Sequence, residues 1–365
     1  MKKKFKILKW ILGVFLSLII LLVSLFFWIR SLIPPRDTNI VSSEAKNIAY
    51  ITEDVPEYRG KILAVVTSTD KMGTSDESTG YELTELARAY YVFKANGFEV
   101  DIASPLGGKP PVVIDDEDMG KYDYAFLNDS IAQYKANNTQ KISNVIAKDY
   151  EAIYFVGGKG AMFDFPNNKA IQSLVRNYYQ NDKVIGAVCH GPAALVNVTL
   201  DNGKPLVENK TVSSFTNEEE LLLISDAKSI FPFLLQDKLV EEGARFNAGT
   251  MYLEKMSHDK NLITGQNPWS VWVLAETMIS ELGYVPKYRP VTDEEHAIHV
   301  LQAYENNGSE GAKTLLNQLI RDEDQPVNRL LIAKHGILAA MKGRLGRFFS
   351  LLNLTSYAKD LEEQE

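Results

Sequence analysis

The stretch VIGAVCHGPAA, residues 184–194, decides the fold. Its first five residues form a continuous apolar run, as expected of a strand that is covered on both faces of a sheet. Cys189 and His190 follow directly, and Gly191-Pro192 then opens a helix, since proline suits a first helical turn. A junction of this kind projects a nucleophile above a sheet. The stretch therefore predicts an α/β fold with a candidate cysteine nucleophile at the carboxyl edge of a strand.

Similar apolar runs occur on both sides of this stretch. They predict further strands at 62–66, 98–103, 152–156, 211–215, 244–248 and 261–264. Helical spacing indicates helices at 80–96 and 269–282. Strands separated by helices imply right-handed crossovers, a largely parallel sheet and ligands bound beyond the carboxyl ends of its strands.

The N-terminal segment has the composition of a membrane anchor. Five lysines within residues 1–9 precede an uncharged apolar run over residues 10–29, which as a helix would span roughly 30 Å, the thickness of a bilayer's hydrocarbon core. No small-residue cleavage site follows, so an uncleaved anchor is favoured over a cleaved signal peptide. The lysines predict a single-pass topology with a cytoplasmic N-terminus and an extracellular or periplasmic domain.

The rest of the chain divides by composition. A polar linker over residues 30–59 leads to the α/β domain at 60–283, and residues 284–365 form an extension. Helices are expected in this extension at 293–306, 309–321 and 326–350. We expect the extension to dock on the α/β domain, with contact to a membrane interface as the alternative. A net charge of −8 argues against nucleic-acid binding.

The single cysteine of the chain, Cys189, excludes an intrachain disulfide. One interpretation is a buried structural cysteine beside a capping histidine. The strand–Cys–His–Gly–Pro context favours a nucleophile, whose thiol pKa the adjacent His190 and the following helix N-terminus would lower. His296 and His299 are interpreted as part of an exposed polar helix face rather than as metal ligands. Neither a metal site nor a cofactor is predicted.

Six segments, taken in order, resemble one known family. They are STGYELTE (78–85), FEVDIASP (98–105), VGGKG (156–160), AVCHGP (187–192), FTNEEE (215–220) and LITGQNP (262–268). Together they resemble the ThiJ/PfpI family of class I glutamine amidotransferase-like proteins, in the branch of heat-shock chaperones and glutathione-independent glyoxalases. The resemblance covers residues 60–283 and implies a flavodoxin-like three-layer sandwich.

The resemblance also implies roles for four side chains. Cys189 matches the family nucleophile, and His190 matches the adjacent histidine of the triad. Glu85 matches the helix carboxylate that lies against the sulfur, where it must be protonated to avoid repelling a thiolate. Glu220 matches the acid that orients the histidine, with Glu219 as the alternative.

A glycine loop completes the implied site. Gly157 and Gly158 match a loop whose N–H groups line an oxyanion pocket, and Gly191 is assigned to the same substrate-binding group. The family has a histidine after the glycine pair, whereas this chain has Lys159. The lysine could favour an acidic substrate or could point to solvent.

Three functions are compatible with these residues. The first is an enzyme that acts on small reactive carbonyls through Cys189, as glyoxalases and deglycases of the family do. The second is a stress chaperone that holds unfolded proteins without using the thiol. The third is a Cys-His amidase or peptidase. We rank the carbonyl enzyme first, with a small carbonyl substrate, a membrane contact through residues 10–29 and a possible homodimer as its partners.

Overall fold

The computed structural model describes residues 2–35, 37–116 and 118–364, which fall into two compact units. One unit holds residues 38–290, and the other combines residues 1–37 with residues 291–365.

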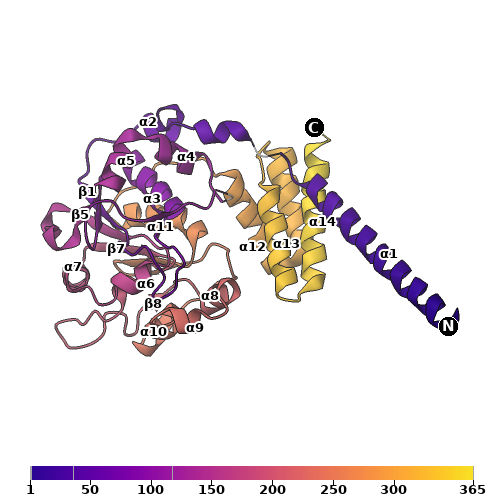
Figure 1. The fold of residues 1–365 in the computed structure, drawn as a ribbon. Coiled ribbons are helices and arrows are strands. Elements are labelled where there is room, and N and C mark those ends of the chain that lie inside the picture. Colours follow the sequence, from indigo (N-terminus) through magenta and orange to yellow (C-terminus); the bar gives the residue numbers. More distant parts are fainter. Residues whose placement is uncertain (1, 36, 117, 365) are drawn as a thin grey trace. The chain divides into compact units, whose positions relative to one another are not determined.

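The α/β unit is built on a seven-stranded sheet in the order β10-β11-β7-β6-β1-β3-β5. Figure 1 labels β1, β5 and β7 of this sheet and the helices around it. Its strands are β1 (Lys61–Val65), β3 (Glu99–Ser104), β5 (Gln140–Lys141), β6 (Ala152–Phe155), β7 (Val184–Val188), β10 (Met256–Asp259) and β11 (Leu262–Gly265). All neighbours pair in parallel except β10, which runs antiparallel to β11. From β1 the chain turns first to β3 on one side and later to β6 on the other, so the carboxyl ends of β1 and β6 mark the switch point where such sheets bind ligands.

Two hydrophobic layers sandwich this sheet. Successive side chains of a strand point to opposite faces, so Ile62 and Ala64 join one buried cluster and Leu63 and Val65 join the other. The first face is covered by α3 (Leu83–Ala95), α4 (Lys121–Asn128), α5 (Ser130–Asn137) and α11 (Val271–Glu281). The second is covered by α6 (Ala161–Asp164), α7 (Lys169–Gln180), η5 (Gly191–Leu195), α9 (Ala227–Ile230) and α10 (Leu235–Glu241).

Short elements connect these layers. They are η1 (Thr38–Ser42), η2 (Ala45–Asn47), α2 (Ala49–Thr52), β2 (Tyr81–Glu82), β4 (Val112–Val113), η3 (Ile142–Asn144), η4 (Ala147–Asp149), β8 (Thr211–Val212), α8 (Asn217–Leu223), β9 (Arg245–Phe246) and η6 (Pro268–Ser270). The expected helix at 80–96 begins only at Leu83, because Tyr81 and Glu82 pair with β4.

The strands expected at 211–215 and 244–248 are shorter than predicted and lie outside the main sheet. They form a separate parallel pair, β8 with β9. Pairing ends after Val212, where the N–H of Ser213 donates to the side-chain hydroxyl of Thr264 on β11, 2.9 Å away, rather than to a backbone carbonyl of β9. The antiparallel strand β10 was not predicted, since its residues Met256–Asp259 are mostly polar.

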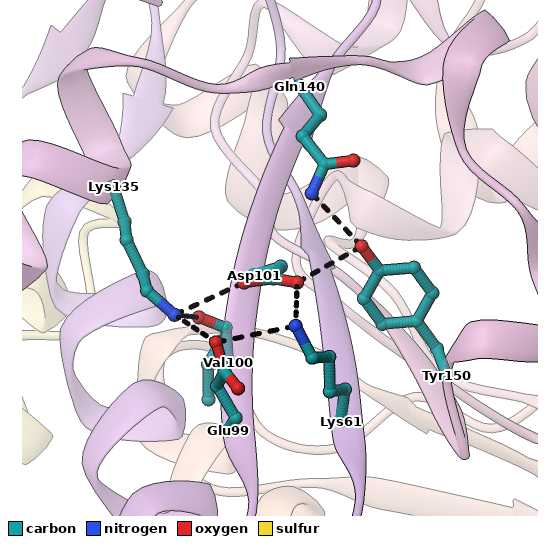
Figure 2. Close-up of polar contacts among 7 residues, drawn as sticks. All are labelled: Lys61, Glu99, Val100, Asp101, Lys135, Gln140 and Tyr150. Atoms are coloured by element: carbon teal, nitrogen blue, oxygen red, sulfur yellow. Dashed lines mark hydrogen bonds and ion pairs between the residues drawn. The ribbon is translucent and has the colours of Figure 1, made fainter.

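A polar cluster crosses β1, β3 and β5 and ties α5 to the sheet (Figure 2). The Asp101 carboxylate accepts from Lys135 Nζ at 3.1 Å, from Lys61 Nζ at 3.2 Å and from the Tyr150 hydroxyl at 3.2 Å. Burial alone would raise the pKa of Asp101, but the hydrogen bonds and charges of Lys135 and Lys61 outweigh it and hold the pKa below its usual value.

The second unit consists of α1 (Lys2–Leu32), α12 (Asp293–Asn317), the π-helical turn η7 (Gln318–Asp322), α13 (Arg329–Met341) and α14 (Leu345–Glu362). The break expected near residue 307 is present, since Gly308 adopts φ 66° within α12. The single helix expected at 326–350 is wrong. The chain ends α13 at Met341, passes through Gly343 at φ 70° and starts α14 at Leu345.

Two side chains of this unit correct or extend the sequence interpretation. His296 is buried rather than exposed, and its Nδ1 lies 2.9 Å from the carbonyl oxygen of Pro326, to which it donates. The end of α1 is tied to α13, because Arg329 Nη1 donates to the carbonyl oxygen of Leu32 at 2.9 Å. Within α1, residues Lys9–Leu32 are long and apolar enough to cross a bilayer, a property that signal sequences share.

Candidate active site

Cys189 occupies a strained turn at the carboxyl end of β7. Its φ is 57°, in the left-handed region that residues other than glycine seldom adopt. The turn is pinned on both sides, since Cys189 N–H donates to Gly265 O and Phe215 N–H donates to Cys189 O, both at 2.9 Å. The Cys189 side chain is buried. Strain held in this way is typical of functional sites.

His190 links the thiol to a carboxylate. Its Nδ1 lies 3.3 Å from Cys189 Sγ, and its Nε2 lies 2.6 Å from Glu220 Oε2. A carboxylate only accepts hydrogen bonds, so Nε2 carries a hydrogen and Nδ1 is the nitrogen that can receive the thiol proton. The ring is buried and packs on Phe215 with centroids 4.6 Å apart.

Glu219 and Glu220 are adjacent on α8 but face different groups. The Glu219 carboxylate accepts hydrogen bonds from five groups and does not reach His190. Its donors are Thr216 N, Thr216 Oγ1, Tyr252 N, Gln266 Nε2 and Asn267 Nδ2, at 2.8 to 3.2 Å. The structure therefore brings Glu220, and not the alternative Glu219, to the histidine.

Glu85 lies in the first turn of α3 and is fully buried at 0% exposure. Its Oε2 accepts from Gly157 N–H at 2.7 Å, while Oε1 has no nitrogen or oxygen partner among the described residues. Burial first, and then the negative charge of Glu82, raise the pKa of Glu85 well above its usual value. The hydrogen bond between the carboxyl and the Cys189 side chain, the hydrogen bond from Gly157 N–H and the charge of Arg88 oppose this shift without cancelling it.

The expectation of a lowered thiol pKa for Cys189 is wrong. Burial, and next the Glu85 carboxyl, raise the pKa of the thiol well above its usual value. The predicted helix after the cysteine is only the five-residue 3₁₀ helix Gly191–Leu195, and so short a helix supplies little dipole. Both shifts favour the protonated form of each group, beside a histidine that can accept a proton.

The glycine loop has no space for side chains. A Cβ on Gly157 would lie 2.5 Å from Glu85 Oε2 and 2.8 Å from Cys189 Cβ. Gly158 has φ 101°, and a Cβ there would lie 2.3 Å from Gly80 O. Gly191 packs against β6, where a Cβ would lie 2.3 Å from Phe155 O. The Gly157 N–H donates to Glu85 Oε2, so in this structure it does not point to an oxyanion as the sequence comparison led us to expect.

Lys159 is partly buried and interacts electrostatically with Glu82. Burial, and next the charge of Asp115, raise the pKa of Glu82 to about 7, while Lys159 and then Arg88 oppose the shift. The charge of the lysine therefore acts on a carboxyl next to the site.

Sequence reasoning missed several neighbours of the site. Tyr154 on β6 donates its hydroxyl to the Glu85 carbonyl oxygen at 3.0 Å. Gln266 and Asn267 lie in a segment that the resemblance included, but their hold on Glu219 comes only from the structure. Tyr252 gives no motif signal at all. Across residues 2–35, 37–116 and 118–364, no three His, Cys, Asp or Glu side chains form a metal-ligand group.

The α/β unit that carries this site is similar to known proteins. The model described as the DJ-1/PfpI family matches residues 77–281, within the α/β unit. Glutathione-independent glyoxalase hsp3102 of Schizosaccharomyces pombe is 32% identical over 216 residues, which are 56% of this chain and 90% of that protein. Glutathione-independent glyoxalase HSP31 of Saccharomyces cerevisiae is 32% identical over 238 residues, which are 61% of this chain and 98% of that protein.

Two solved structures resemble the α/β unit in both fold and sequence. Rapid Encystment Protein 24 kDa of Francisella tularensis is 38% identical with a TM-score of 0.58, covering 61% of this chain and 99% of that one. Glyoxalase III of Candida albicans is 29% identical with a TM-score of 0.57, covering 62% of this chain and 98% of that one.

Proposed function

Because this chain belongs to the DJ-1/PfpI family, we propose that it is a glutathione-independent glyoxalase-like enzyme that acts on small 2-oxoaldehydes such as methylglyoxal. The curated relatives that match it over most of their length carry glyoxalase names. One observation carries the proposal. The buried Glu85 carboxyl, whose pKa is raised, and the Glu220-bound His190 both interact with the same buried thiol.

The first step joins sulfur to the aldehyde carbon. His190 Nδ1 takes the thiol proton as Cys189 Sγ attacks, and Glu85 gives its proton to the aldehyde oxygen, which yields a hemithioacetal. The N–H groups of Gly158 and His190 donate no backbone hydrogen bond among the described residues. They are our candidates for stabilising the oxygen while it carries negative charge.

The second step moves a hydrogen between carbons. Glu85, now a carboxylate, takes the proton from the former aldehyde carbon and returns it to the neighbouring carbon. The hemithioacetal hydroxyl proton passes to the neighbouring oxygen, so the product is a thioester of a 2-hydroxy acid. Water then attacks the thioester carbon, adding its hydroxyl group there and giving its other proton to the Glu85 carboxylate. The sulfur leaves with the proton held by His190, so the hydroxy acid is released and the thiol, the histidine and the Glu85 acid are all restored. No external oxidant or reductant is needed.

The test is glutathione-free turnover by the full chain in detergent. We expect loss of methylglyoxal and appearance of lactate, with Cys189→Ser and His190→Asn each reducing kcat/KM by about 10²–10⁴-fold. His258→Asn is the control, because His258 lies 38% exposed on β10, paired with Glu281. Suppression of protein aggregation that survives Cys189→Ser, without dicarbonyl turnover, would instead identify a chaperone.

We also infer that α1 anchors the enzyme in a membrane with the N-terminus in the cytoplasm. The apolar helix Lys9–Leu32 and the lysines before it support this topology. Carbonate washing should leave the chain in the membrane pellet, and protease added to intact cells should remove the α/β unit. Release of a shortened chain would instead identify a cleaved signal sequence.

A further inference from the structure

Two strained residues stand apart from the other left-handed ones in the chain. Positive φ among the described non-glycine residues falls on Asp, Asn and Lys, except at Cys189 (φ 57°) and Tyr252 (φ 54°). Aspartate and asparagine tolerate this region, whereas a bulky aromatic residue there is an outlier. Strain at Cys189 is explained by its role as the nucleophile, so the strain at Tyr252 calls for a reason of the same kind.

A buried carboxylate holds Tyr252 in this conformation. Glu219 Oε1 accepts from Tyr252 N–H at 2.8 Å, and the Tyr252 hydroxyl lies 3.4 Å from the Glu219 carbonyl oxygen. Gln266 and Asn267, which follow the carboxyl end of β11, donate to the same Glu219 oxygen at 3.0 and 3.2 Å. The sheet edge that carries Cys189 therefore also fixes the position of Tyr252.

The Tyr252 ring extends an aromatic wall that begins at the histidine. His190 and Phe215 pack with centroids 4.6 Å apart, and Phe215 and Tyr252 meet edge to face at 6.1 Å. His190, Phe215 and Cys189 are buried, whereas Tyr252 is partly exposed. Tyr252 is thus the outermost member of the wall, and it lies within electrostatic range of the Cys189 thiol.

We propose that Tyr252 is a specificity-determining residue, whose ring closes the outer side of the thiol site and restricts it to carbonyl compounds with a short substituent. The assignment deepens the proposed glyoxalase function and rests on it for the identity of the substrate. Two adjacent residues of α8 then have different roles. Glu220 orients the histidine, and Glu219 positions Tyr252 of the wall. A dicarbonyl with a bulky substituent, such as phenylglyoxal, would meet the Tyr252 ring.

Substrate competition tests this assignment in the full chain. Tyr252→Ala should shift the ratio of kcat/KM for phenylglyoxal to that for methylglyoxal upward by about 10-fold or more, the scale on which pocket size discriminates substrates. Tyr252→Phe keeps the ring and should leave the ratio within about 2-fold of the wild type. An unchanged ratio in a folded Tyr252→Ala protein would overturn the proposal.

Alkylation provides a readout that needs no turnover. Because Cys189 is the only cysteine, its labelling rates with iodoacetamide and with a bulky fluorescein maleimide can be compared directly. Tyr252→Ala should accelerate the bulky reagent more than the small one, and equal acceleration would contradict the wall. If the wild type consumes neither dicarbonyl, the proposed reaction fails while this comparison still decides the position of Tyr252.

A third variant separates strain from the ring. Tyr252→Gly also removes the ring but adopts φ 54° without steric cost, so it should melt at a higher temperature than Tyr252→Ala while showing the same selectivity. This variant also serves if Tyr252→Ala does not fold. Equal melting temperatures for the Gly and Ala variants would show that the backbone at this position stores no strain.

Discussion

At the residue scale, Glu85 combines complete burial with a raised pKa, which is the combination that an acid catalyst needs at neutral pH. Glu85→Gln keeps the shape but cannot exchange a proton, so we expect kcat to fall by about 10²–10⁴-fold in a folded protein. Glu99→Gln, on a side chain that is 43% exposed in the cluster of Figure 2, is the control and should retain activity. Wild-type turnover by Glu85→Gln would remove Glu85 from the mechanism.

The raised pKa of Glu85 should also make the stability of the protein depend on pH. Burial raises the folded-state pKa of Glu85 above its ordinary value of 4.5, so its contribution to stability is present below pH 4.5 and is lost as the pH rises toward the folded-state pKa. Denaturant unfolding of Glu85→Gln should therefore show a shallower loss of stability above this pH than the wild type. Parallel curves for the two proteins would show that Glu85 does not titrate abnormally.

The thiol itself should react slowly at neutral pH. Burial raises the pKa of Cys189, so iodoacetamide labelling followed against pH should have its midpoint above the value of about 8.5 for a free thiol. A midpoint below this value would support the lowered thiol pKa expected from sequence. Cys189 would then react as a thiolate, and His190 would not need to take its proton in the first step.

At the scale of elements, the Asp101 cluster joins β1, β3 and α5 (Figure 2). Asp101→Asn removes the charge that two lysines share and should lower the free energy of unfolding by about 1–2 kcal/mol, a modest value because both lysines are partly exposed. The folded-state pKa of Asp101 is lowered, so this contribution is present above its unfolded-state pKa and is lost as the pH falls through the folded-state pKa. Glu44→Gln breaks an exposed pair with Lys46 and should change stability by less than about 0.5 kcal/mol.

At the scale of the whole molecule, the chain divides into two compact units, and the end of the apolar helix α1 belongs to the unit of the C-terminal helices. Within this unit, Arg329 joins α1 to the C-terminal helices, because it donates to Leu32 O and pairs with Glu362 at 3.1 Å. Arg329→Ala should therefore destabilise this unit. We expect calorimetry in detergent to show two transitions, of which Arg329→Ala shifts one, with kcat unchanged. A single transition that moves as a whole would favour an extension docked on the α/β unit, which stays our prediction from sequence.

Sequence alone determined the elements that depend on local patterns. The apolar runs at 62–66, 152–156 and 184–188 became β1, β6 and β7, because strands covered on both faces need continuous apolar residues. The Cys-His string after β7 and the Glu at 85 were recognisable for the same reason, since each belongs to a short contiguous segment.

Only the tertiary structure decided which groups meet. The choice of Glu220 over Glu219 depends on the direction of two adjacent side chains at the start of α8, which no local pattern encodes. The raised pKa of Cys189 follows from burial by segments distant in sequence, and burial outweighs the adjacent histidine and the short helix from which the opposite shift was expected. Tyr252 reaches the site through a carboxylate 33 residues earlier in the chain. Local sequence sets backbone preference, whereas protonation and side-chain contact depend on what the whole fold places around each group.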